Sequence, residues 1–511
     1  MSKISIKKNF IMNAILTISG FIFPLISFPY VSRVLGPTGT GKVDFAVSFI
    51  SYFALFANLG IPYYGVRSCA QVRDDKIKLS QTVRELMVIN AVMSLISIVA
   101  FIPFLFLMPK VSAEKILYLV ILITIPMNVI GIEYLYKGLE QYSYITIRSV
   151  LFKLISVISL FIFVRDPSDY IEYGAVTIFA NSASFVLNFL HSRKYIKYFN
   201  IGKCNYKRHF KPIGTFFAMS LAVSLYVSLD RVMLGFMTND TQVGYYSAAV
   251  KFKSILVALV TSLGNVLMPR ASYCVNKGLM DEFLRLITKA LKFVFIAATP
   301  LFIFFTLFAE DGMLFISGRE YMPAVLGMQV ITPTVLFIGL TGLIGVQVFV
   351  PLGKEKYVLY SEIAGAITDL VLNALLIPRY QATGAAIGTL VAEFVVLAVQ
   401  VFLLTKIKDL SPVISVFPQI KYWIIILACV LAVASSMWVN IVYPVFFKTD
   451  LVFKGHMVGV DMINSFLRLL IAAILYFGVY VVVMIVAKDD MMIEIVNTVL
   501  KKFRRKGEIS V

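Results

Sequence analysis

The chain consists mostly of apolar stretches that are each long enough to cross a lipid bilayer. A spanning helix needs roughly 20 mainly apolar residues, and about 14 such stretches follow one another along this sequence. A backbone inside a bilayer has to satisfy its hydrogen bonds within helices or a closed barrel, and stretches of this length favour helices. The sequence therefore predicts an all-α, polytopic membrane protein with spans at 10–30, 43–63, 87–108, 116–136, 149–164, 171–190, 213–234, 244–268, 286–308, 327–350, 357–377, 384–404, 420–440 and 466–487.

Most of the 47 Lys and Arg residues fall into alternate connections between these stretches. Cytoplasmic loops of membrane proteins hold the excess of Lys and Arg, so we expect both termini in the cytoplasm. A net charge of +19 would suggest nucleic acid in a soluble protein. Here the charges are spread over short loops without a recognition fold, and they are better explained by topology and an anionic leaflet. No nucleic-acid partner is expected.

The cysteines and histidines do not predict a metal or catalytic site. Cys69, Cys204 and Cys274 fall in predicted cytoplasmic loops and Cys429 falls within a span, so reduced thiols are expected. The cysteines lack metal-ligand spacing, and the three histidines lie far apart in the sequence. We therefore predict no metal, no resident cofactor and no enzymatic activity.

The chain also contains an internal duplication. The first span ends on Arg-Val-Leu-Gly at 33–36, and the seventh ends on Arg-Val-Met-Leu-Gly at 231–235. Each is followed by a polar turn and a glycine, Gly41 or Gly244, that begins the next helix. Chance similarity between apolar helices is the alternative, although the matched positions are charged residues and glycines. The duplication predicts a parallel repeat, with an N-terminal lobe at 1–190, a basic cytoplasmic linker at 191–212, a C-terminal lobe at 213–405, two added helices at 406–487 and a basic cytoplasmic tail at 488–511.

Polar residues inside the spans repeat at helical spacing. Polar groups are costly in a bilayer, so such faces are expected to line a wet cavity. Small polar residues that join helices are the alternative explanation, and it stays open for the serine-rich faces. The faces with ionisable or amide groups provide the candidates: Asp44 in the second span, Asn181 and Asn188 in the sixth, Glu362 and Asp369 in the eleventh, and Glu393 and Gln400 in the twelfth.

Several cations lie in or beside the spans. Snorkelling to the inner interface is the simpler explanation for Lys289, Lys292, Arg148 and Arg270. A second group is better placed for a positively lined chamber that suits an anionic ligand, above all a phosphate. These candidates are Arg33, Lys153, Arg231 and Lys251.

Several motifs resemble those of the Wzx-type oligosaccharide-lipid flippases, which are polysaccharide transporters of the multidrug/oligosaccharidyl-lipid/polysaccharide exporter superfamily. The similar segments cover about the first 405 residues, while the last two spans are a variable addition. Individually the motifs are weak, but their order and spacing are fairly specific. They are FIFPLISFPYVSRVLGPTGTG at 21–41, NLGIPYYGVR at 58–67 and YLYKGLEQY at 134–142.

The resemblance implies two six-helix lobes that alternate between inward-open and outward-open forms in the bacterial inner membrane. The cargo would be an undecaprenyl-diphosphate-linked sugar repeat unit, and polysaccharide polymerase machinery is a candidate partner. The four chamber cations would hold the diphosphate or acidic sugars, and Asn181, Asn188 and Gln400 would contact sugar hydroxyls. Related lipid II flippases carry several arginines on the first helix, where this chain has Ser27. The candidates for coupling to protons or sodium are Asp44, Glu362, Asp369 and Glu393.

Two other functions remain as alternatives. A cation-coupled multidrug exporter of the same superfamily would favour an anionic, aromatic-lined cavity. A membrane polysaccharide polymerase or ligase would need a catalytic platform outside the membrane, whereas the longest outer connection, about 441–465, is short and has no acid–base constellation. The sequence leaves open which glycan is carried and whether the product is O antigen, capsule or exopolysaccharide.

Overall fold

The computed structural model describes residues 6–198, 202–407, 422–446, 458–494 and 496–497. Every regular element in this part of the chain is helical, as the sequence predicts. The first group of helices is α1 (Ile6–Asn58), α2 (Ile61–Gln71), α3 (Lys76–Leu107), α4 (Pro109–Ser112), α5 (Lys115–Leu122), α6 (Thr124–Gly131), α7 (Glu133–Gly138), α8 (Tyr142–Phe163), α9 (Tyr170–Ile178), η1 (Phe179–Ala183), α10 (Ser184–Ser192) and α11 (Lys207–Met237).

The second group continues to the C-terminal part of the chain. Its members are α12 (Asp240–Asn276), α13 (Met280–Leu307), α14 (Ala309–Ile316), η2 (Arg319–Ala324), α15 (Val325–Ile331), α16 (Thr334–Gly342), η3 (Leu343–Phe349), α17 (Glu355–Leu404), α19 (Tyr422–Phe446) and α20 (Val458–Val486). The chain divides into two compact units, Met1–Ser247 and Ala248–Val511, and the division falls within α12. The lobe boundaries expected from the duplication remain predictions.

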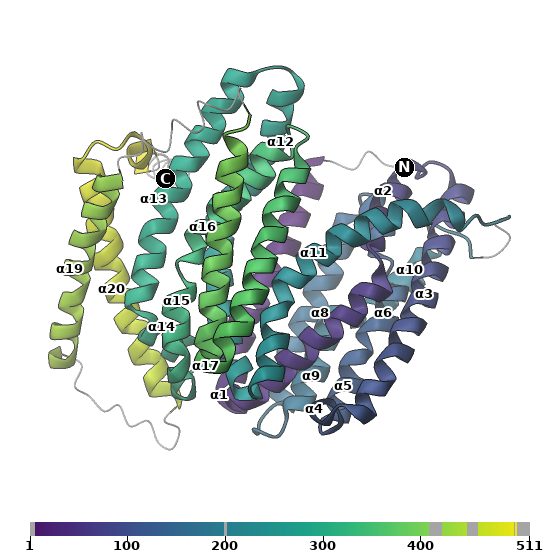
Figure 1. Cartoon of the computed structure of the whole chain (residues 1–511), viewed down its shortest axis with the longest axis horizontal. Helices are drawn as coiled ribbons and strands as arrows, with labels where there is room; N and C mark the ends of the chain where they lie inside the picture. The colour runs from purple at the N-terminus through teal and green to yellow at the C-terminus, as the bar shows by residue number, and fades with distance from the viewer. Residues whose placement is uncertain (1–5, 199–201, 408–421, 447–457, 495, 498–511) are drawn as a thin grey trace, which may run out of the picture. The chain divides into compact units, whose positions relative to one another are not determined.

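Two helices are each long enough for two spans. A helix rises about 1.5 Å per residue, so the 53 residues of α1 and the 50 residues of α17 far exceed a bilayer core of about 30 Å. Each contains one residue with non-helical dihedral angles: Gly36 in α1, with φ 64° and ψ −178°, and Gln381 in α17, with φ 51° and ψ −129°. Figure 1 shows α1 turning back on itself near its label. The sequence places a turn between spans at both positions.

The remaining spans include continuous and broken helices. In the described residues, nine helical segments are long and apolar enough to cross a membrane, or up to ten with a pair bent by 45° at Arg319–Ile331 and Thr334–Phe349. This bend interrupts the predicted span at 327–350. A left-handed residue, Ile132 with φ 34°, interrupts the one at 116–136. The all-α, polytopic prediction is confirmed, and several spans are assembled from shorter helices.

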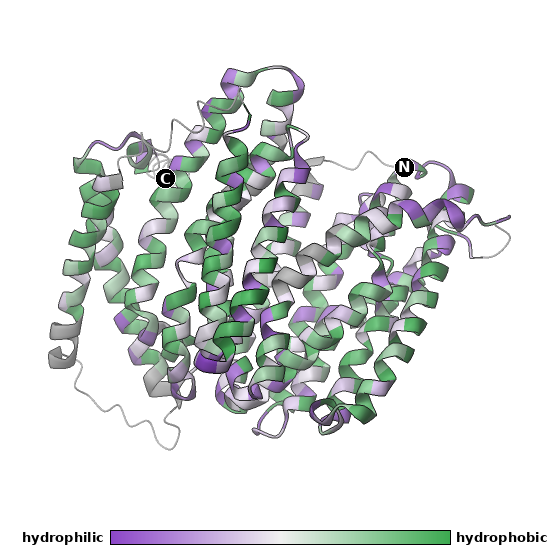
Figure 2. Ribbon diagram, viewed as in Figure 1, coloured by the Kyte–Doolittle hydropathy of each residue, from purple (hydrophilic) through white to green (hydrophobic). Residues whose placement is uncertain are grey.

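Apolar side chains cover much of the helical surface. Phe106 on α3, Ile147 on α8 and Ile474 on α20 are 69%, 64% and 65% exposed. Figure 2 shows hydrophobic residues along the lengths of the helices and hydrophilic residues gathered mainly near their ends. Exposed apolar faces of this extent would be unfavourable in water and are favourable against lipid. The chain is a multi-pass membrane protein.

Buried apolar clusters hold each unit together. In the first unit, one cluster joins α2, α3 and α7 around Leu86 and Leu135, and another joins α1, α8 and α9 around Val31 and Leu160. In the second unit, α13 packs with α19 and α20, and the Tyr480 hydroxyl donates to the Ile296 carbonyl at 3.0 Å. The polar residues described below are therefore held on helices whose positions are fixed by packing.

Candidate functional site

The two turns matched by the internal duplication meet each other in the first unit. A Cβ on Gly41 would overlap the carbonyl oxygen of Asp240, and a Cβ on Gly244 would overlap the carbonyl oxygen of Pro37. The hydroxyls of Thr38 and Thr241, which lie 203 residues apart, are 2.8 Å from each other. We call this meeting of 37–41 with 240–244 the outer-turn contact, because the sequence predicts both turns on the outer side.

The outer-turn contact is reciprocal. Gly41 and Gly244 are separated by the same interval as Thr38 and Thr241, and so are Pro37 and Asp240. The first glycine approaches the second turn as the second glycine approaches the first, which is the pattern of a two-fold interface. Only glycine allows such a close approach of two backbones. The duplication therefore has a structural consequence, a local two-fold relation between the repeated turns.

Two of the predicted chamber cations stand beside this contact. Arg33 is half-buried on α1, and its Nη1 donates to the Pro29 carbonyl at 2.6 Å. Arg231 is half-buried on α11, and its Nε donates to the Ser247 hydroxyl at 3.2 Å. Ser247 and the candidate Asp44 are related by the interval of the repeat, and both are on the helices that follow the turns. The structure thus places Arg33, Arg231 and Asp44 around related turns.

The other two chamber cations lie elsewhere. Lys153 on α8 donates to the Ser19 hydroxyl at 3.0 Å, in the first half of α1. Fourteen residues separate Ser19 from Arg33 on the same helix, which is about 21 Å of helical rise. Lys251 is half-buried in the second unit. A single diphosphate cannot contact Lys153 and Arg33 together, so the four predicted cations do not form one compact site in this structure.

The two asparagines predicted to contact sugars have different surroundings. Asn181 is exposed and lies in η1, a π-helical turn of a kind frequent at functional sites. Asn188 is fully buried, donates to the Gly131 carbonyl at 2.6 Å, and so joins α10 to α6. The π turn between them changes the helical register, so the face expected from regular α-helical spacing is not maintained. Asn181 is accessible to a ligand in this structure, whereas Asn188 is enclosed by protein.

The polar residues of α17 meet where its two halves pack together. A Cβ on Gly388 would overlap the Asn373 side-chain oxygen and would lie 3.3 Å from an oxygen of Asp369. Gln400 is 1% exposed, and its amide donates to the Ser361 hydroxyl at 3.2 Å. Gln400 and Asp369 therefore belong to a buried polar seam within the second unit.

Two further carboxylates belong to the same seam. Glu362, on the first half of α17, is close enough to Glu393 on the second half for their charges to interact. Glu393 is 5% exposed and Glu362 is half-buried. The structure brings three of the four coupling candidates together here, while Asp44 lies in the first unit.

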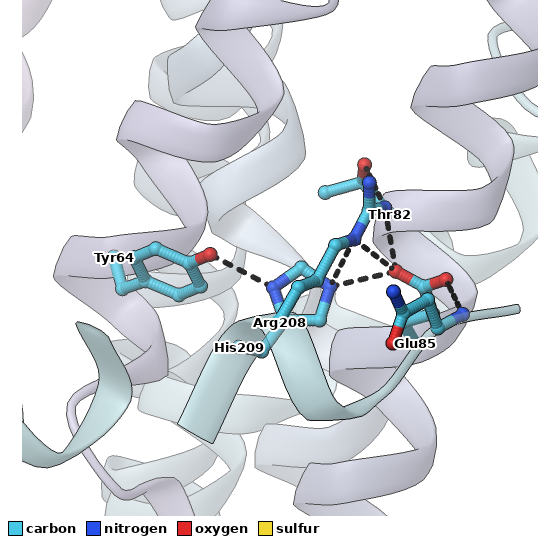
Figure 3. Close-up of polar contacts among 6 residues, drawn as sticks. Tyr64, Thr82, Glu85, Arg208 and His209 are labelled. Carbon is cyan, nitrogen blue, oxygen red and sulfur yellow. Dashed lines mark hydrogen bonds and ion pairs between the residues drawn. The ribbon is translucent and has the colours of Figure 1, made fainter. Parts of the chain in front are cut away.

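A densely bonded polar group lies near the predicted inner side of the first unit, and we call it the Glu85 cluster (Tyr64, Thr82, Glu85, Arg208 and His209; Figure 3). Glu85 on α3 is 1% exposed. Its carboxylate accepts from Arg208 Nη2 at 2.6 Å and from His209 Nε2 at 2.7 Å. The Tyr64 hydroxyl is 2.8 Å from His209 Nδ1, and Arg208 also donates to Thr82 at 3.2 Å.

The charges of the Glu85 cluster follow from its burial. Burial and, to a smaller extent, the charge of Arg208 lower the pKa of His209, and together they outweigh the opposing hydrogen bond and charge of Glu85. The imidazole is therefore neutral at pH 7, with Nε2–H donating to Glu85 and Nδ1 accepting from Tyr64. The backbone N–H of Asn205 is a further donor to Glu85, at 2.5 Å. Several donors thus surround one carboxylate and connect the first turn of α11 and the segment before it to α3.

Sequence reasoning missed the Glu85 cluster. It treated His209 only as a residue of the basic linker, and it did not single out Glu85. The residues of the ion pair lie 123 positions apart, so no local spacing relates them. One signal was available: Glu85 is a carboxylate two residues before the predicted span at 87–108, and an acid so close to the membrane favours a partner.

The comparisons with known proteins agree with this architecture. The model of the polysaccharide biosynthesis protein family matches residues 6–274. A putative O-antigen transporter of Escherichia coli (strain K12) is 25% identical over 397 residues, which cover 77% of this chain and 95% of that protein.

Two solved structures have the same fold. An inward closed form of the lipid II flippase MurJ has a TM-score of 0.63 at 14% identity, covering 92% of this chain and 98% of that one. An inward-facing multidrug resistance MATE family transporter of the MOP superfamily has a TM-score of 0.60 at 15% identity, covering 79% and 98%. Because the family model matches more than half of the residues, the chain belongs to the polysaccharide biosynthesis protein family.

Proposed function

We propose that this protein is a flippase that moves lipid-linked oligosaccharides across the bacterial inner membrane. Its cargo would be an undecaprenyl-diphosphate-linked repeat unit, delivered from the inner to the outer leaflet for surface polysaccharide synthesis. The observation that carries this proposal is the similarity to an O-antigen transporter over nearly that protein's whole length. The multi-pass fold supports it, because the proposed step is movement through a membrane without a change in covalent bonds.

The outer-turn contact suggests how such a protein alternates. Parallel-repeat transporters expose a site to each side of the membrane in turn. We propose that this contact closes the outer side and that the turns separate when the outer side opens. Gly41 and Gly244 then have a definite role, because side chains there would prevent closure.

The positions of the cations suggest a path with several contacts. Lys153 on α8 contacts α1 at Ser19, far along that helix from Arg33, so we propose that the diphosphate contacts the two cations in turn as the protein alternates. Arg231 is the related cation on α11, and Asn181 is the accessible partner for sugar hydroxyls. We propose the buried carboxylates of α17 as the coupling group for protons or sodium, since three of them share one seam.

The function is tested by expression in a strain that lacks its own O-antigen flippase and makes the matching repeat unit. We expect surface polysaccharide to return, with fewer lipid-linked repeat units on the inner leaflet. If the protein is present in the membrane and lipid-linked units remain inside for every repeat unit tried, the proposed function is wrong.

Arg231→Ala then tests the proposed path. A hydrogen bond to a charged group contributes about 1.5–3 kcal/mol, so we expect export to fall at least about tenfold. Arg73→Ala is the matched control, since Arg73 forms an exposed ion pair with Glu140 at 2.9 Å. Unchanged export by Arg231→Ala at equal protein levels would remove this residue from the mechanism.

A further inference from the structure

Helix α13 carries a row of cations on one face near its N-terminal end. Arg285, Lys289 and Lys292 follow one another at intervals of four and three residues, which places them on the same side of an α-helix. Like charges at these spacings repel each other. The sequence explains Lys289 and Lys292 by snorkelling, but snorkelling does not account for their gathering with Arg285.

A pocket of about 300 Å³ opens over this row. Lys488 and the segment that follows α20 form its opposite wall, and apolar side chains from α13, α19 and that segment complete it. The pocket therefore has an apolar portion beside a charged one, and all of it belongs to the second unit. Its lining residues other than the α13 cations are Thr288, Ile296, Ile425, Lys488, Asp489, Asp490, Met491 and Glu494.

The acidic residues of the lining leave part of the positive charge available. Glu494 pairs with Lys289 at 2.5 Å, and both side chains are more than half exposed. Asp489 accepts from the backbone N–H of Met492 at 2.9 Å, which engages one of its oxygens. Within the described part of the chain, Arg285, Lys292 and Lys488 make no ion pair. Four basic and three acidic residues line the pocket, including Asp490, so its formal net charge is +1 and the guanidinium and ammonium groups on α13 form its most basic wall.

The pocket also lies near the predicted inner side of the membrane, where lipid head groups are found. Arg285 and Lys488 fall in segments that the charge distribution places on the inner side of the membrane. The apolar wall is continuous with the buried cluster of α13, α19 and α20, to which Ile296 and Ile425 belong. Basic pockets between transmembrane helices on the cytoplasmic side are suited to anionic lipid head groups. A phosphodiester could accept from the cations while its acyl chains remain among apolar residues.

We propose that this pocket binds the phosphodiester head group of an anionic membrane phospholipid. The proposal does not depend on the proposed function, because none of the residues proposed to contact the cargo lines the pocket. It assigns a role to the cations of α13 and places a structural lipid beside the two C-terminal helices. Glu494 would release Lys289 or share it when the lipid binds.

The test uses the full chain in nanodiscs that contain equal amounts of phosphatidylglycerol and phosphatidylcholine. The protein is released into the gas phase, and native mass spectrometry counts the retained lipids. We expect at least one phosphatidylglycerol on the wild type and its loss from Arg285→Gln/Lys292→Gln. The matched control is Lys354→Gln/Lys356→Gln, which removes the same charge from an exposed, predicted inner loop and should retain the lipid.

The possible results distinguish a phospholipid from the cargo as the molecule that occupies the pocket. Thermal unfolding first establishes that the wild type and the pocket variant are both folded. Equal retention of phosphatidylglycerol by the two proteins would then overturn the proposal. So would equal retention of both phospholipids by the wild type, because the head-group charge would then not matter. If equimolar undecaprenyl diphosphate displaces the retained phosphatidylglycerol, and a tenfold excess of phosphatidylglycerol does not reverse this, the pocket belongs to the cargo instead. Lys488→Gln provides a second, milder variant, which should weaken retention without abolishing it.

Discussion

The two ends of the first unit are held together by different kinds of contact. At the predicted outer end, the repeated turns meet through backbone atoms of Gly41 and Gly244 and one exposed pair of threonine hydroxyls. At the predicted inner end, the Glu85 cluster surrounds a buried carboxylate with hydrogen-bond donors. Lys110 adds polar contacts at the outer end, to the Gly235 carbonyl and, at 2.8 Å, to Asp240.

The two contacts differ in the free energy that is needed to separate them. Separating the two glycine turns gives up van der Waals contact, the Thr38–Thr241 hydrogen bond and the partly exposed Lys110–Asp240 ion pair, and water can solvate the groups that are released. Pulling donors away from a carboxylate that stays buried leaves an uncompensated charge, which is strongly unfavourable. We therefore expect the outer-turn contact to separate during function and the Glu85 cluster to remain intact.

The largest effect is expected from a disulfide across the outer-turn contact. In Thr38→Cys/Thr241→Cys, the two sulfur atoms would replace hydroxyls that are 2.8 Å apart, within reach of a bond of about 2.05 Å. Oxidation should reduce export to background, and a reductant should restore it. The two single-cysteine variants are the controls. Full cross-linking with normal export would show that the turns do not need to separate.

Alanine at the contact glycines should have the next largest effect. Gly41→Ala and Gly244→Ala would each place a methyl group against the backbone of the other turn. Overpacking costs about 1–3 kcal/mol, so we expect the closed form to become roughly tenfold rarer or more. Export should fall, and Thr38→Cys should react faster with a membrane-impermeant thiol reagent in these backgrounds. Gly214→Ala on α11, with no neighbour within 4 Å, should behave as the wild type, and an equal loss there would contradict the explanation.

Removing the Glu85 carboxylate should destabilise the fold rather than lower the export rate of each folded molecule. Glu85→Ala leaves the buried His209 Nε2–H and the Asn205 backbone N–H without their shared acceptor, and we expect a loss of about 1–3 kcal/mol. Thermal unfolding in detergent measures the change, and export divided by protein level should remain near normal. Glu140→Ala removes an exposed ion pair with Arg73 and should cost about 0–1 kcal/mol. Equal melting temperatures for the two variants would argue against a special role for the cluster.

The smallest expected effect is a pH dependence that arises from His209. Its pKa is lowered in the folded state by burial, so protonation favours the unfolded state. The associated stability is fully present above the unfolded pKa of about 6.5 and is lost as the pH falls through it towards the folded value. Between pH 7.5 and 5.5 we expect the wild type to lose about 1–2 °C more than His209→Asn. If the melting temperatures of the wild type and His209→Asn change equally with pH, His209 does not titrate in this way.

The sequence predicted the helical framework and the breaks inside α1 and α17 because these depend on neighbouring residues, whereas the breaks within the predicted spans 116–136 and 327–350 were not predicted. Apolar length locates the spans, and Gly36 with its polar turn marks the break inside α1. The repeated Arg and Gly positions indicated the relation between the two turns. Helical spacing also grouped Glu362 with Asp369 on one predicted face and Glu393 with Gln400 on another, but it did not predict that the two faces pack together within α17.

Contacts between distant helices could not be predicted in the same way. The sequence predicted the same sugar-contacting role for Asn181 and Asn188. A π turn changes the helical register between them and leaves Asn181 exposed and Asn188 enclosed by protein. Arg148, which snorkelling would place at the interface, is buried in the structure, where it pairs with Glu133 at 2.9 Å. A helical spacing gives the direction of a side chain from its own axis. It does not give the neighbour that the side chain meets.

By itself, the sequence determined that this chain is a multi-pass helical membrane protein with a repeated plan, since bilayer thickness and helical periodicity act locally along the chain. Only the tertiary structure decided that Gly41 meets Asp240 and that Glu85 meets His209, because these contacts depend on how helices pack and bend. It also separated Lys153 from Arg33, which composition alone had grouped by charge. Residue chemistry sets which partners are favourable, and packing sets which partners are within reach.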